Sequence, residues 1–482
     1  MPPKKRPLYT LILAAGHGKR MKSRRIKLLH EVTGRPMLTW VLEALRGVPA
    51  KESFIVLGHQ ADLVRGLVAG TPFRVLLQRE QRGTGHAVMQ AERPLREAAG
   101  DLLILNGDTP AIRTSTLKDF VSGHVKSGAA ASVLTTTLEN PAGYGRVLRD
   151  GLGELTGIVE ERDATPEERR VREVSAGIWC VDIPRLFRAL RRTRPDNAQG
   201  EFYLPDILGI FKENGHKIVA VRHDEPWEVL GVNSRAELSR LARLINRRIV
   251  DGWMDMGVSV VDPDRTFIGP DVKIGQDTLL YPDVHLVGAT SIGRDCTIHP
   301  GCFLRDTRMD DGAVLLPSCV STESRIGPRA QIGPFAHLRP GCDLGPDVKI
   351  GNFVELKKTR VGAGSKANHL AYLGDAEIGK AVNVGAGTIT CNYDGTHKYK
   401  TILENGVFVG SDSQLVAPVR VRRGAYIGAG STIVSDVPAG ALALARSRQT
   451  IVRGWVAKKK KEKKAEAASA ARKAAVRRVP RG

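Results

Sequence analysis

The fold of the second half of the chain is decided by residues 268–304, which read IGPDVKIGQDTLLYPDVHLVGATSIGRDCTIHPGCFL. In this stretch an aliphatic residue recurs every six positions, at Ile268, Ile274, Leu280, Leu286, Ile292, Ile298 and Leu304. Neither the 3.6-residue period of a helix nor the two-residue period of a strand produces this spacing. A repeat this short predicts a solenoid, in which stacked coils of short parallel strands turn their aliphatic side chains inward.

The six-residue spacing continues in two further runs. They comprise Val314, Val320, Ile326, Ile332, Leu338, Leu344, Ile350 and Leu356, and then Val409, Leu415, Val421, Ile427 and Ile433. The pattern breaks between residues 361 and 390 and again through residues 391–401. We expect loops to protrude from the solenoid at both breaks, and loops on a rigid scaffold often carry functional groups.

The first 230 residues or so have a different texture, in which short apolar runs alternate with helical patterns. Residues 37–45 place Met37, Leu38, Val41 and Leu45 on one helical face. The alternation predicts an α/β domain around a mostly parallel sheet, whose ligands bind beyond the carboxyl ends of the strands. The candidate strands are residues 9–15, 54–57, 75–77, 102–105 and 132–138.

A connecting helix is predicted between the two halves. Ser234 followed three residues later by Glu237 is a capping-box pattern, and apolar residues then recur at helical spacing from Leu238 to Ile249. We therefore expect four segments: an α/β domain at 1–233, a helical linker at 234–256, the solenoid at 257–456 and a tail at 457–482.

Length and composition favour a cytoplasmic chain of several domains. The 482 residues are too many for one compact domain, and 42% hydrophobic and 26% charged residues disfavour both wholesale disorder and a membrane bundle. The longest apolar run, residues 8–15, is far below the roughly 20 residues that span a bilayer. The six cysteines contain no CxxC pair, which favours a reducing compartment and implies no structural zinc site.

The net charge of +22 is concentrated toward the carboxyl end. Residues 457–482 hold 11 basic and 2 acidic residues, including four consecutive lysines at 458–461, and no apolar periodicity. This composition predicts a disordered, solvated tail. Electrostatic attachment to nucleic acid or to an acidic partner is the alternative interpretation.

A glycine-rich, basic segment follows the first predicted strand. Residues 13–21 read LAAGHGKRM, and Lys27 comes six residues later. Glycines let backbone N–H groups approach a phosphate closely, while Lys19, Arg20 and Lys27 can neutralise a polyphosphate. The spacing differs from dinucleotide-binding and Walker sequences. A plain strand-to-helix turn with surface charges is the alternative.

Polar residues also end or follow other predicted strands. Asp108 closes the run 102–108, and a carboxylate at a strand's carboxyl end is suited to hold magnesium through oxygen. Further groups that could read a base or a sugar are Gln78, residues 83–85, residues 143–146 and Glu160.

This set of residues, together with residues 197–201 and 231–233, resembles the sugar nucleotidyltransferases that carry a hexapeptide-repeat acyltransferase domain. The resemblance is closest to the family of the bifunctional bacterial N-acetylglucosamine-1-phosphate uridylyltransferase / glucosamine-1-phosphate N-acetyltransferase, and it covers about residues 9–455. It implies a Rossmann-like α/β nucleotidyltransferase domain followed by a left-handed parallel β-helix, assembled as a homotrimer. It also implies UTP and acetyl-CoA as cosubstrates, glucosamine 1-phosphate and N-acetylglucosamine 1-phosphate as sugar substrates, and magnesium as cofactor.

For the first domain, the resemblance implies attack by a sugar phosphate on the α-phosphorus of UTP. In such a reaction the protein mainly aligns the two reactants and neutralises the negative charge of the phosphates. Asp108 and Asn233 would bind magnesium, and Lys27 and Arg20 would act in catalysis. The nucleotide and its sugar would contact Leu13, Ala14, Ala15, Gly16, Lys27, Gln78, Gly83, Thr84, Gly107, Asp108, Gly145, Glu160, Ser175 and Asn233.

Three positions depart from the family pattern. Lys19 and Ile26 stand where threonine and proline are usual, and Ser175 stands where an asparagine contacts the sugar. A serine is shorter and lacks the paired donor and acceptor of an amide. A direct hydrogen bond to the sugar is therefore lost or passes through water, which affects sugar choice.

In the solenoid, residues 351–358 (GNFVELKK) and 365–375 (SKANHLAYLGD) are unusually polar for a coil face. Acetylating a sugar amine requires removal of a proton, and a neutral imidazole near pH 7 suits that task. The resemblance implies that His369 is this general base and that Glu355 orients it. Glucosamine 1-phosphate would bind Arg339, Lys357, Tyr372, Asn383 and Asn392, and acetyl-CoA would bind Ala386, Asn392, Tyr393, Lys398, Ser411, Ala429 and Arg446.

We therefore expect a bifunctional cytoplasmic enzyme that makes UDP-N-acetylglucosamine, the precursor of peptidoglycan and, in many bacteria, of lipopolysaccharide. Two other hypotheses stay open. One is a single-activity sugar-1-phosphate nucleotidyltransferase whose β-helix is only structural. The other is a non-catalytic nucleotidyltransferase-like scaffold whose basic tail contacts RNA, although Lys27 and Asp108 count against it.

Overall fold

The computed structural model describes residues 6–16, 18–58 and 61–476, with the backbone alone for Lys19 and for residues 474–476. His17 of the glycine-rich segment and residues 477–482 of the predicted tail lie outside the described residues. Residue contacts divide the chain into two compact units, 1–341 and 342–482. The division falls inside the solenoid, because each coil of such a fold contacts only its neighbours and a boundary can fall between any two coils.

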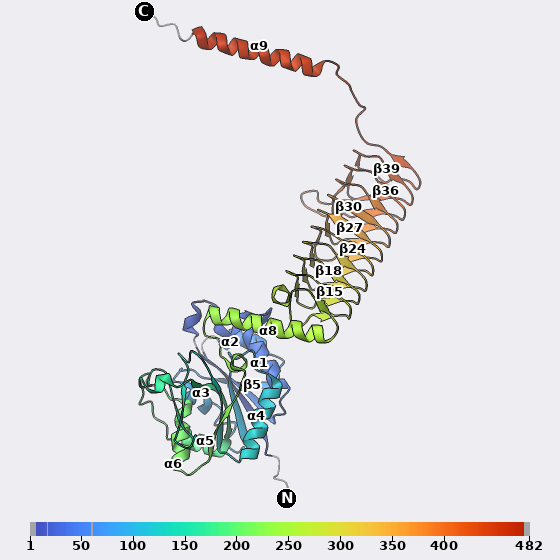
Figure 1. Cartoon of the computed structure of the whole chain (residues 1–482). Coiled ribbons are helices and arrows are strands. Elements are labelled where there is room, and N and C mark those ends of the chain that lie inside the picture. Colours follow the sequence, from blue (N-terminus) through green and yellow to red (C-terminus); the bar gives the residue numbers. More distant parts are fainter. Residues whose placement is uncertain (1–5, 17, 59–60, 477–482) are drawn as a thin grey trace, which may run out of the picture. The chain divides into compact units, whose positions relative to one another are not determined.

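A nine-stranded sheet forms the centre of the α/β domain in the first unit (Figure 1). Its main order is β11-β7-β10-β6-β1-β4-β5, with β8 beside β10 and β9 beside β8. Strand β1 runs parallel to β4 and β6, whereas β10 is antiparallel to β6 and β7. The strands are β1 (Leu8–Ala14), β4 (Glu52–Leu57), β5 (Phe73–Leu77), β6 (Asp101–Asn106), β7 (Ala131–Thr137), β8 (Arg146–Arg149), β9 (Leu155–Val159), β10 (Glu173–Asp182) and β11 (Ile218–Arg222). The mostly parallel sheet is confirmed.

Alternating residues of the sheet are buried in two separate cores. On β1, Leu11 belongs to the core that includes Val88 and Phe211, whereas its neighbour Ile12 belongs to the core that includes Leu38 and other residues of the predicted first helix. Both faces of the sheet are thus covered by helices, as a parallel sheet requires. The helices are α1 (Met37–Arg46), α2 (Ala61–Val68), α3 (Thr84–Met89), α4 (Thr114–Ser127), α5 (Ile183–Leu190), α6 (Ile207–Glu213) and α7 (Pro226–Val229), and a short hairpin is formed by β2 (Glu31–Val32) and β3 (Arg35–Pro36).

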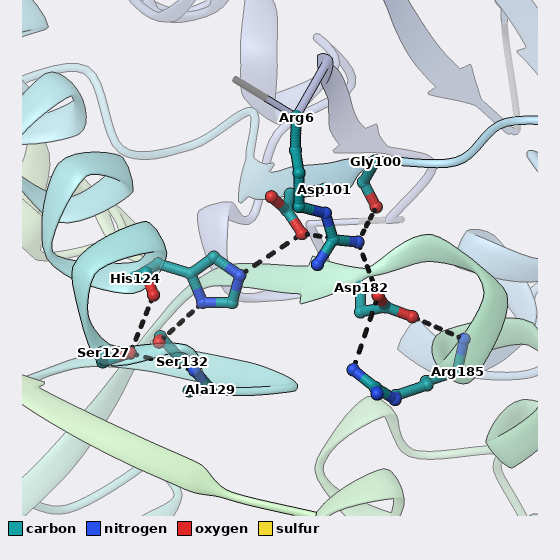
Figure 2. Close-up of polar contacts among 9 residues, drawn as sticks. All are labelled: Arg6, Gly100, Asp101, His124, Ser127, Ala129, Ser132, Asp182 and Arg185. Atoms are coloured by element: carbon teal, nitrogen blue, oxygen red, sulfur yellow. Dashed lines mark hydrogen bonds and ion pairs between the residues drawn. The ribbon is translucent and has the colours of Figure 1, made fainter. Parts of the chain in front are cut away.

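A buried polar network ties the amino-terminal segment to the sheet edge opposite the strands' carboxyl ends (Figure 2). Arg6 Nη2 donates to Asp182 Oδ2 at 2.5 Å and lies 3.3 Å from Asp101 Oδ1. His124 Nε2 approaches the same Asp101 oxygen at 3.5 Å. Asp182 also accepts a bond from Arg185 N and so caps α5. One guanidinium therefore serves two carboxylates that are almost fully buried.

We expect Arg6→Met to lower the free energy of unfolding by about 2 kcal/mol, because it leaves two buried carboxylates without their shared cation. The value lies below that of a fully buried pair because the Arg6 side chain is 42% exposed. Urea unfolding followed by tryptophan fluorescence measures it. Arg65→Met removes an exposed pair with Asp62 and should cost less than about 0.5 kcal/mol. Equal losses in the two variants would contradict this role for Arg6.

The predicted connecting helix is α8 (Arg235–Asp255). The Ser234 side chain accepts a bond from Glu237 N at 3.2 Å, and the Glu237 carboxylate accepts one from Asn233 N at 2.7 Å. The capping pattern is therefore confirmed. Since Glu237 holds the backbone of Asn233, the start of this helix fixes a residue that the sequence analysis singled out for metal binding.

The solenoid is a left-handed parallel β-helix whose strands form three parallel sheets in each unit (Figure 1). In the first unit these are β12 (Ser259–Val260), β15 (Leu279–Leu280), β18 (Thr297–Ile298), β21 (Val314–Leu315) and β24 (Gln331–Ile332); β13 (Phe267–Ile268), β16 (His285–Val287), β19 (Phe303–Arg305), β22 (Val320–Thr322) and β25 (His337–Leu338); and β14 (Lys273–Ile274), β17 (Ser291–Ile292), β20 (Arg308–Met309) and β23 (Arg325–Ile326).

In the second unit the three sheets continue the same pattern. They comprise β27 (Lys349–Asn352), β30 (Lys366–His369), β33 (Asn383–Val384), β36 (Phe408–Val409), β39 (Tyr426–Ile427) and β41 (Leu442–Ala443); β28 (Glu355–Lys357), β31 (Tyr372–Gly374), β34 (Ile389–Cys391), β37 (Gln414–Val416) and β40 (Thr432–Ile433); and β26 (Asp343–Leu344), β29 (Arg360–Val361), β32 (Ala376–Ile378), β35 (Thr401–Leu403) and β38 (Val419–Val421).

The structure corrects the predicted register at two positions. Val314 and Val320 are only half-buried, whereas their neighbours Leu315 and Ser321 point into the core. The step from Ser321 to the next inward-pointing aliphatic residue, Ile326, has five residues instead of six. Counting back from Ile326 in steps of six therefore gives Val320 and Val314, each one residue before the residue whose side chain points inward.

One of the two predicted loop regions is also corrected. Residues 361–390 form regular coils instead of loops, and small or polar residues such as Ala367 and Thr390 occupy their inward positions. In contrast, residues 392–400 do lie outside the strands, between β34 and β35, with a single bridge between Tyr393 and Lys398.

The expectation of a disordered tail is wrong for its described part, which continues helix α9 (Trp455–Val476). Alanine, lysine and glutamate favour helices even without a packing partner, and Lys459 pairs with Glu462 one turn on. The described side chains from Trp455 to Lys473 are almost all exposed. Across the described residues, no helix has both the length and the hydropathy to cross a bilayer. Attachment of the tail to nucleic acid or to an acidic partner stays a prediction.

Candidate active sites

Two cavities meet at the carboxyl edge of the α/β sheet. Their volumes are about 520 Å³ and 190 Å³, and Leu13, Thr84, Asn106 and Asp108 line both. The larger is also lined by Ala14, Ala15, Gly16, Lys27, Gln78 and Gly83, all predicted for UTP. The smaller is also lined by Gly145, Glu160, Ser175 and Asn233. The fold thus gathers residues far apart in the sequence into one connected site.

The glycine-rich segment is shaped by close backbone approaches. Strand β1 ends at Ala14, and the chain then turns along the larger cavity. Gly18 has φ +62°, and a Cβ there would lie 2.6 Å from Lys27 Cβ. Only glycine combines that backbone conformation with that contact. The missing side chain allows Lys27 to pack against the segment and to reach the cavity.

Lys27 lies between the two residues that the sequence analysis assigned to magnesium. Its ammonium donates to Asp108 Oδ2 and, at 2.8 Å, to Asn233 Oδ1. The Lys27 and Asp108 side chains are only 11% and 20% exposed, so the ion pair is largely withdrawn from water. A carboxylate and an amide oxygen that converge on one point are suited to hold a cation, and that cation can in turn neutralise phosphates.

The smaller cavity has a half-buried acid, Glu160, at its wall. A Cβ on Gly145 would lie 2.9 Å from Ile158 Cγ2, so a larger residue there would have to displace the Ile158 side chain. Burial, together with Asp163, Asp206 and Glu201, raises the pKa of Glu160. Burial likewise raises the pKa of Tyr144 to about 12, so the phenol stays protonated beside this cavity.

Two of the predicted residues lie outside the cavity walls. Gly107 is buried, and its N–H donates to Leu13 O at 2.9 Å, so it joins β6 to β1. Arg20 is exposed near Gly143, where a Cβ would lie 3.7 Å from Arg20 Nη1. The sequence analysis did not single out two of the lining residues, Asn106 and Gln81. Asn106 could have been found, because it ends the same strand that Asp108 follows two residues later.

In the second unit, His369 lies at the end of β30 and is exposed. Its Nδ1 forms a 3.0 Å hydrogen bond with Asn352 Oδ1 from β27, a residue that the sequence analysis missed. Nε2 of a neutral imidazole held in this way carries a lone pair that can accept a proton.

A cluster of two lysines lies on the same unit. Lys357 Nζ is 3.6 Å from Asp375 Oδ2, and Asn392 Nδ2 donates to that same oxygen. A hydrogen bond with Lys357, together with its positive charge, lowers the pKa of Lys398. Two cations held this close form a suitable site for an anion such as a phosphate dianion.

The other predicted residues of the solenoid lie on neighbouring coils. Glu355 is paired in register with Tyr372, and Asn383 with Lys366. Asp412 N, beside Ser411, donates to Ala386 O at 2.7 Å, and Gly430 N, beside Ala429, donates to Ser411 O at 2.8 Å. Arg446 Nη1 donates to Ala429 O at 2.8 Å, which continues this ladder. Tyr393 is exposed on the protruding loop. Arg339 belongs to the first unit, where its carbonyl accepts a bond from Ser324.

Comparisons with known proteins cover almost the whole chain. Residues 10–172 match the family model of the MobA-like NTP transferase domain, and residues 271–306 and 323–358 match that of the bacterial transferase hexapeptide repeats. A relative from Pelobacter propionicus, named Bifunctional protein GlmU, is 49% identical over 459 residues, which cover 94% of this chain and 98% of the relative. The chain belongs to the GlmU family.

Two further GlmU relatives agree with this assignment. That from Syntrophotalea carbinolica is 48% identical and covers 93% of this chain and 96% of its own length, and that from Trichlorobacter lovleyi is 49% identical with 93% and 98% coverage. Membership in the GlmU family makes the chain a bifunctional uridylyltransferase and acetyltransferase of UDP-N-acetylglucosamine biosynthesis. The predicted fold class and function are therefore confirmed, and neither the single-activity nor the non-catalytic hypothesis holds.

Proposed function

We propose that residues 257–456 transfer the acetyl group of acetyl-CoA to glucosamine 1-phosphate and that residues 1–233 then transfer a uridylyl group from UTP to the N-acetylglucosamine 1-phosphate formed. The observation that carries the proposal is the position of Lys27, whose ammonium contacts Asp108 and Asn233 where the two cavities meet. This is the junction at which a nucleotide in one cavity would meet a sugar phosphate in the other.

In the uridylyl step, a phosphate oxygen of the sugar attacks the α-phosphorus of UTP. The bond from the α-phosphorus to the oxygen of the β-phosphate breaks, and pyrophosphate leaves. Lys27 and Arg20 neutralise the phosphates, and the glycine-rich segment lets backbone N–H groups approach them. The sugar occupies the smaller cavity beside Glu160 and Ser175, and uracil lies near Gln78 in the larger.

The residues at the junction fit magnesium. Asp108 and Asn233 offer oxygen ligands, which hard cations prefer, and both already converge on one ammonium. Within the described residues there is no cluster of three or more histidine, cysteine or acidic side chains suited to a metal. Magnesium commonly takes one or two protein oxygens and completes its shell with water and substrate phosphates. Bound there, it would neutralise charge on the transferring phosphates.

In the acetyl step, the amine nitrogen of glucosamine 1-phosphate attacks the thioester carbon. His369 Nε2 accepts the amine proton, the C–S bond breaks, and coenzyme A leaves as a thiol once protonated. Glu355 orients the imidazole, and Lys357, whose Nζ lies 3.6 Å from Asp375 Oδ2, binds the sugar phosphate. The remaining contacts to this sugar come from Tyr372, Asn383 and Asn392, and the acetyl-CoA groove is formed by Ala386, Asn392, Tyr393, Lys398, Ser411, Ala429 and Arg446.

We further propose that the chain assembles as a homotrimer in the cytoplasm. Hexapeptide-repeat solenoids fit oligomer formation, and this solenoid keeps large apolar side chains such as Phe353 and Tyr426 on its surface. All six cysteines are free thiols, which agrees with a reducing compartment. Light scattering on the purified protein measures the subunit number.

One assay tests the proposed function. Purified protein is supplied with glucosamine 1-phosphate, acetyl-CoA, UTP and magnesium, and free thiol and pyrophosphate are measured together. We expect both products, with pyrophosphate dependent on prior acetyl transfer unless N-acetylglucosamine 1-phosphate is added. Release of only one product would refute the proposed division between the two domains.

Ser175 provides a test of the sugar cavity. Its hydroxyl accepts a bond from Gly177 N at 3.2 Å, and it lines the smaller cavity at an irregularity of β10. We expect Ser175→Asn to lower KM for N-acetylglucosamine 1-phosphate about three- to tenfold, because the longer amide restores a direct hydrogen bond. KM for UTP should be unchanged. An unchanged or higher KM for N-acetylglucosamine 1-phosphate would show that the side chain at position 175 does not contact the sugar.

A further inference from the structure

Asn352 and His369 lie side by side on adjacent coils. Strands β27 and β30, which carry them, pair in parallel with Asn352 directly opposite His369. Leu370 N donates to Asn352 O at 3.0 Å, which extends the pairing past the imidazole. A Cβ on Gly351 would lie 1.9 Å from Asn368 O, so the two coils approach as closely as glycine allows. The backbones of both residues are therefore held in one register.

The side chains meet through one specific hydrogen bond. Asn352 Oδ1 lies 3.0 Å from His369 Nδ1. Because an amide oxygen only accepts, the imidazole proton of the neutral ring must be on Nδ1. Nε2 is then the basic atom, and the ring plane is fixed by its partner on β27. This bond thus selects both the tautomer and the orientation of the imidazole.

We propose that Asn352, through its hydrogen bond to Nδ1 and in addition to Glu355, positions His369 for acetyl transfer, a role that rests on the proposed function of His369 as general base. An amide suits the task for an electrostatic reason. A carboxylate in its place would favour the protonated imidazolium, which has no lone pair to accept the amine proton. The amide orients the ring without adding a negative charge.

The proposal is tested with the full-length protein and two variants, Asn352→Ala and Asn352→Asp. Acetyl transfer is followed by thiol release across pH 5.5–9. We expect Asn352→Ala to lower kcat about tenfold or more, with KM for glucosamine 1-phosphate and acetyl-CoA within about twofold of wild type, because ring orientation matters only as the proton moves. Ionisable groups on the surrounding strands, among them Lys349, Glu355, Lys366 and Tyr372, are unchanged in both variants.

Asn352→Asp distinguishes positioning from a structural role. It keeps an oxygen acceptor, so kcat at high pH should recover most of the loss seen in the alanine variant. Its charge should move the acidic limb of the kcat profile upward by about one pH unit. A merely structural role would lower activity without moving that limb. Wild-type kcat in Asn352→Ala, or an unmoved limb in Asn352→Asp, would overturn the proposal.

Two controls separate this inference from its premise. Asn405→Ala removes another solenoid amide, whose Oδ1 accepts a 2.8 Å bond from Lys380 N, and it should leave the pH profile unchanged. Circular dichroism and thermal unfolding of each variant report whether its solenoid folds. If His369→Ala still transfers acetyl groups, the proposed function itself fails. If His369→Ala is inactive but Asn352→Ala is not impaired, only the role of Asn352 fails.

Discussion

Replacing Asp108 with alanine is expected to lower pyrophosphate release from UTP and N-acetylglucosamine 1-phosphate by about a thousandfold or more. The Asp108 carboxylate lies where both cavities meet, and it is the only negatively charged partner of the Lys27 ammonium that the described contacts show. Without it, the nucleotide site loses an anchor for a divalent cation and a partner that directs the lysine. Thiol release from acetyl-CoA should stay within about twofold of wild type.

The control for this variant is Asp62→Ala, which removes an aspartate on the surface of α2 that is 89% exposed. It should retain both activities. Pyrophosphate release is measured over a magnesium series, because a variant that had lost only metal affinity would regain activity at high magnesium. Near wild-type pyrophosphate release by Asp108→Ala at low magnesium would refute the placement of the metal and phosphate site at this sheet edge.

Replacing His369 with alanine is expected to reduce thiol release by a factor of about 100 to 10,000, the range that general-base catalysis usually supplies. The side chain has the geometry for that role, since Asn352 bonds Nδ1 and leaves Nε2 for the amine proton. Because an ammonium cannot attack a thioester, the loss should be smaller at high pH, where more of the amine is already neutral. Pyrophosphate release from supplied N-acetylglucosamine 1-phosphate should be unaffected.

His299→Ala is the matched control for that substitution. His299 also lies on the solenoid, where its ring stacks on Tyr281 at 4.8 Å, and no proposed step involves it. Both activities should survive its removal. If thiol release fell equally in His299→Ala and His369→Ala, the effect would belong to the solenoid as a scaffold rather than to the imidazole of His369.

The periodic parts of this protein were predictable from local pattern. The six-residue repeat predicted the solenoid because each coil packs inward-pointing aliphatic side chains against those of the neighbouring coils. The capping pattern at Ser234 and Glu237 was predictable for a similar reason, since both partners lie within one helical turn. The glycine-rich segment beside Lys27 was found because strand ends in parallel sheets meet at one edge.

The errors arose where local pattern and packing differ. The prediction that Val314 and Val320 point inward is wrong because no residue type in the sequence marks the five-residue step from Ser321 to Ile326. Residues 361–390 were read as loops because Ala367 and Thr390 fill inward positions with little hydrophobic surface. The tail was expected to be disordered because it lacks a stripe of apolar residues, yet α9 forms from residues with high helix propensity.

The sequence by itself determined the two architectures, the order of the domains and many of the residues that line the first site. These depend on spacing and residue type, which are properties of the linear chain. Only the tertiary structure decided that Lys27 contacts both Asp108 and Asn233, and that Asn352 rather than any sequence neighbour bonds His369. The physical reason is that a hydrogen bond depends on distance in space. Coil stacking and strand order bring together residues that are far apart in the sequence, and their spacing along the chain does not predict which of them will be in contact.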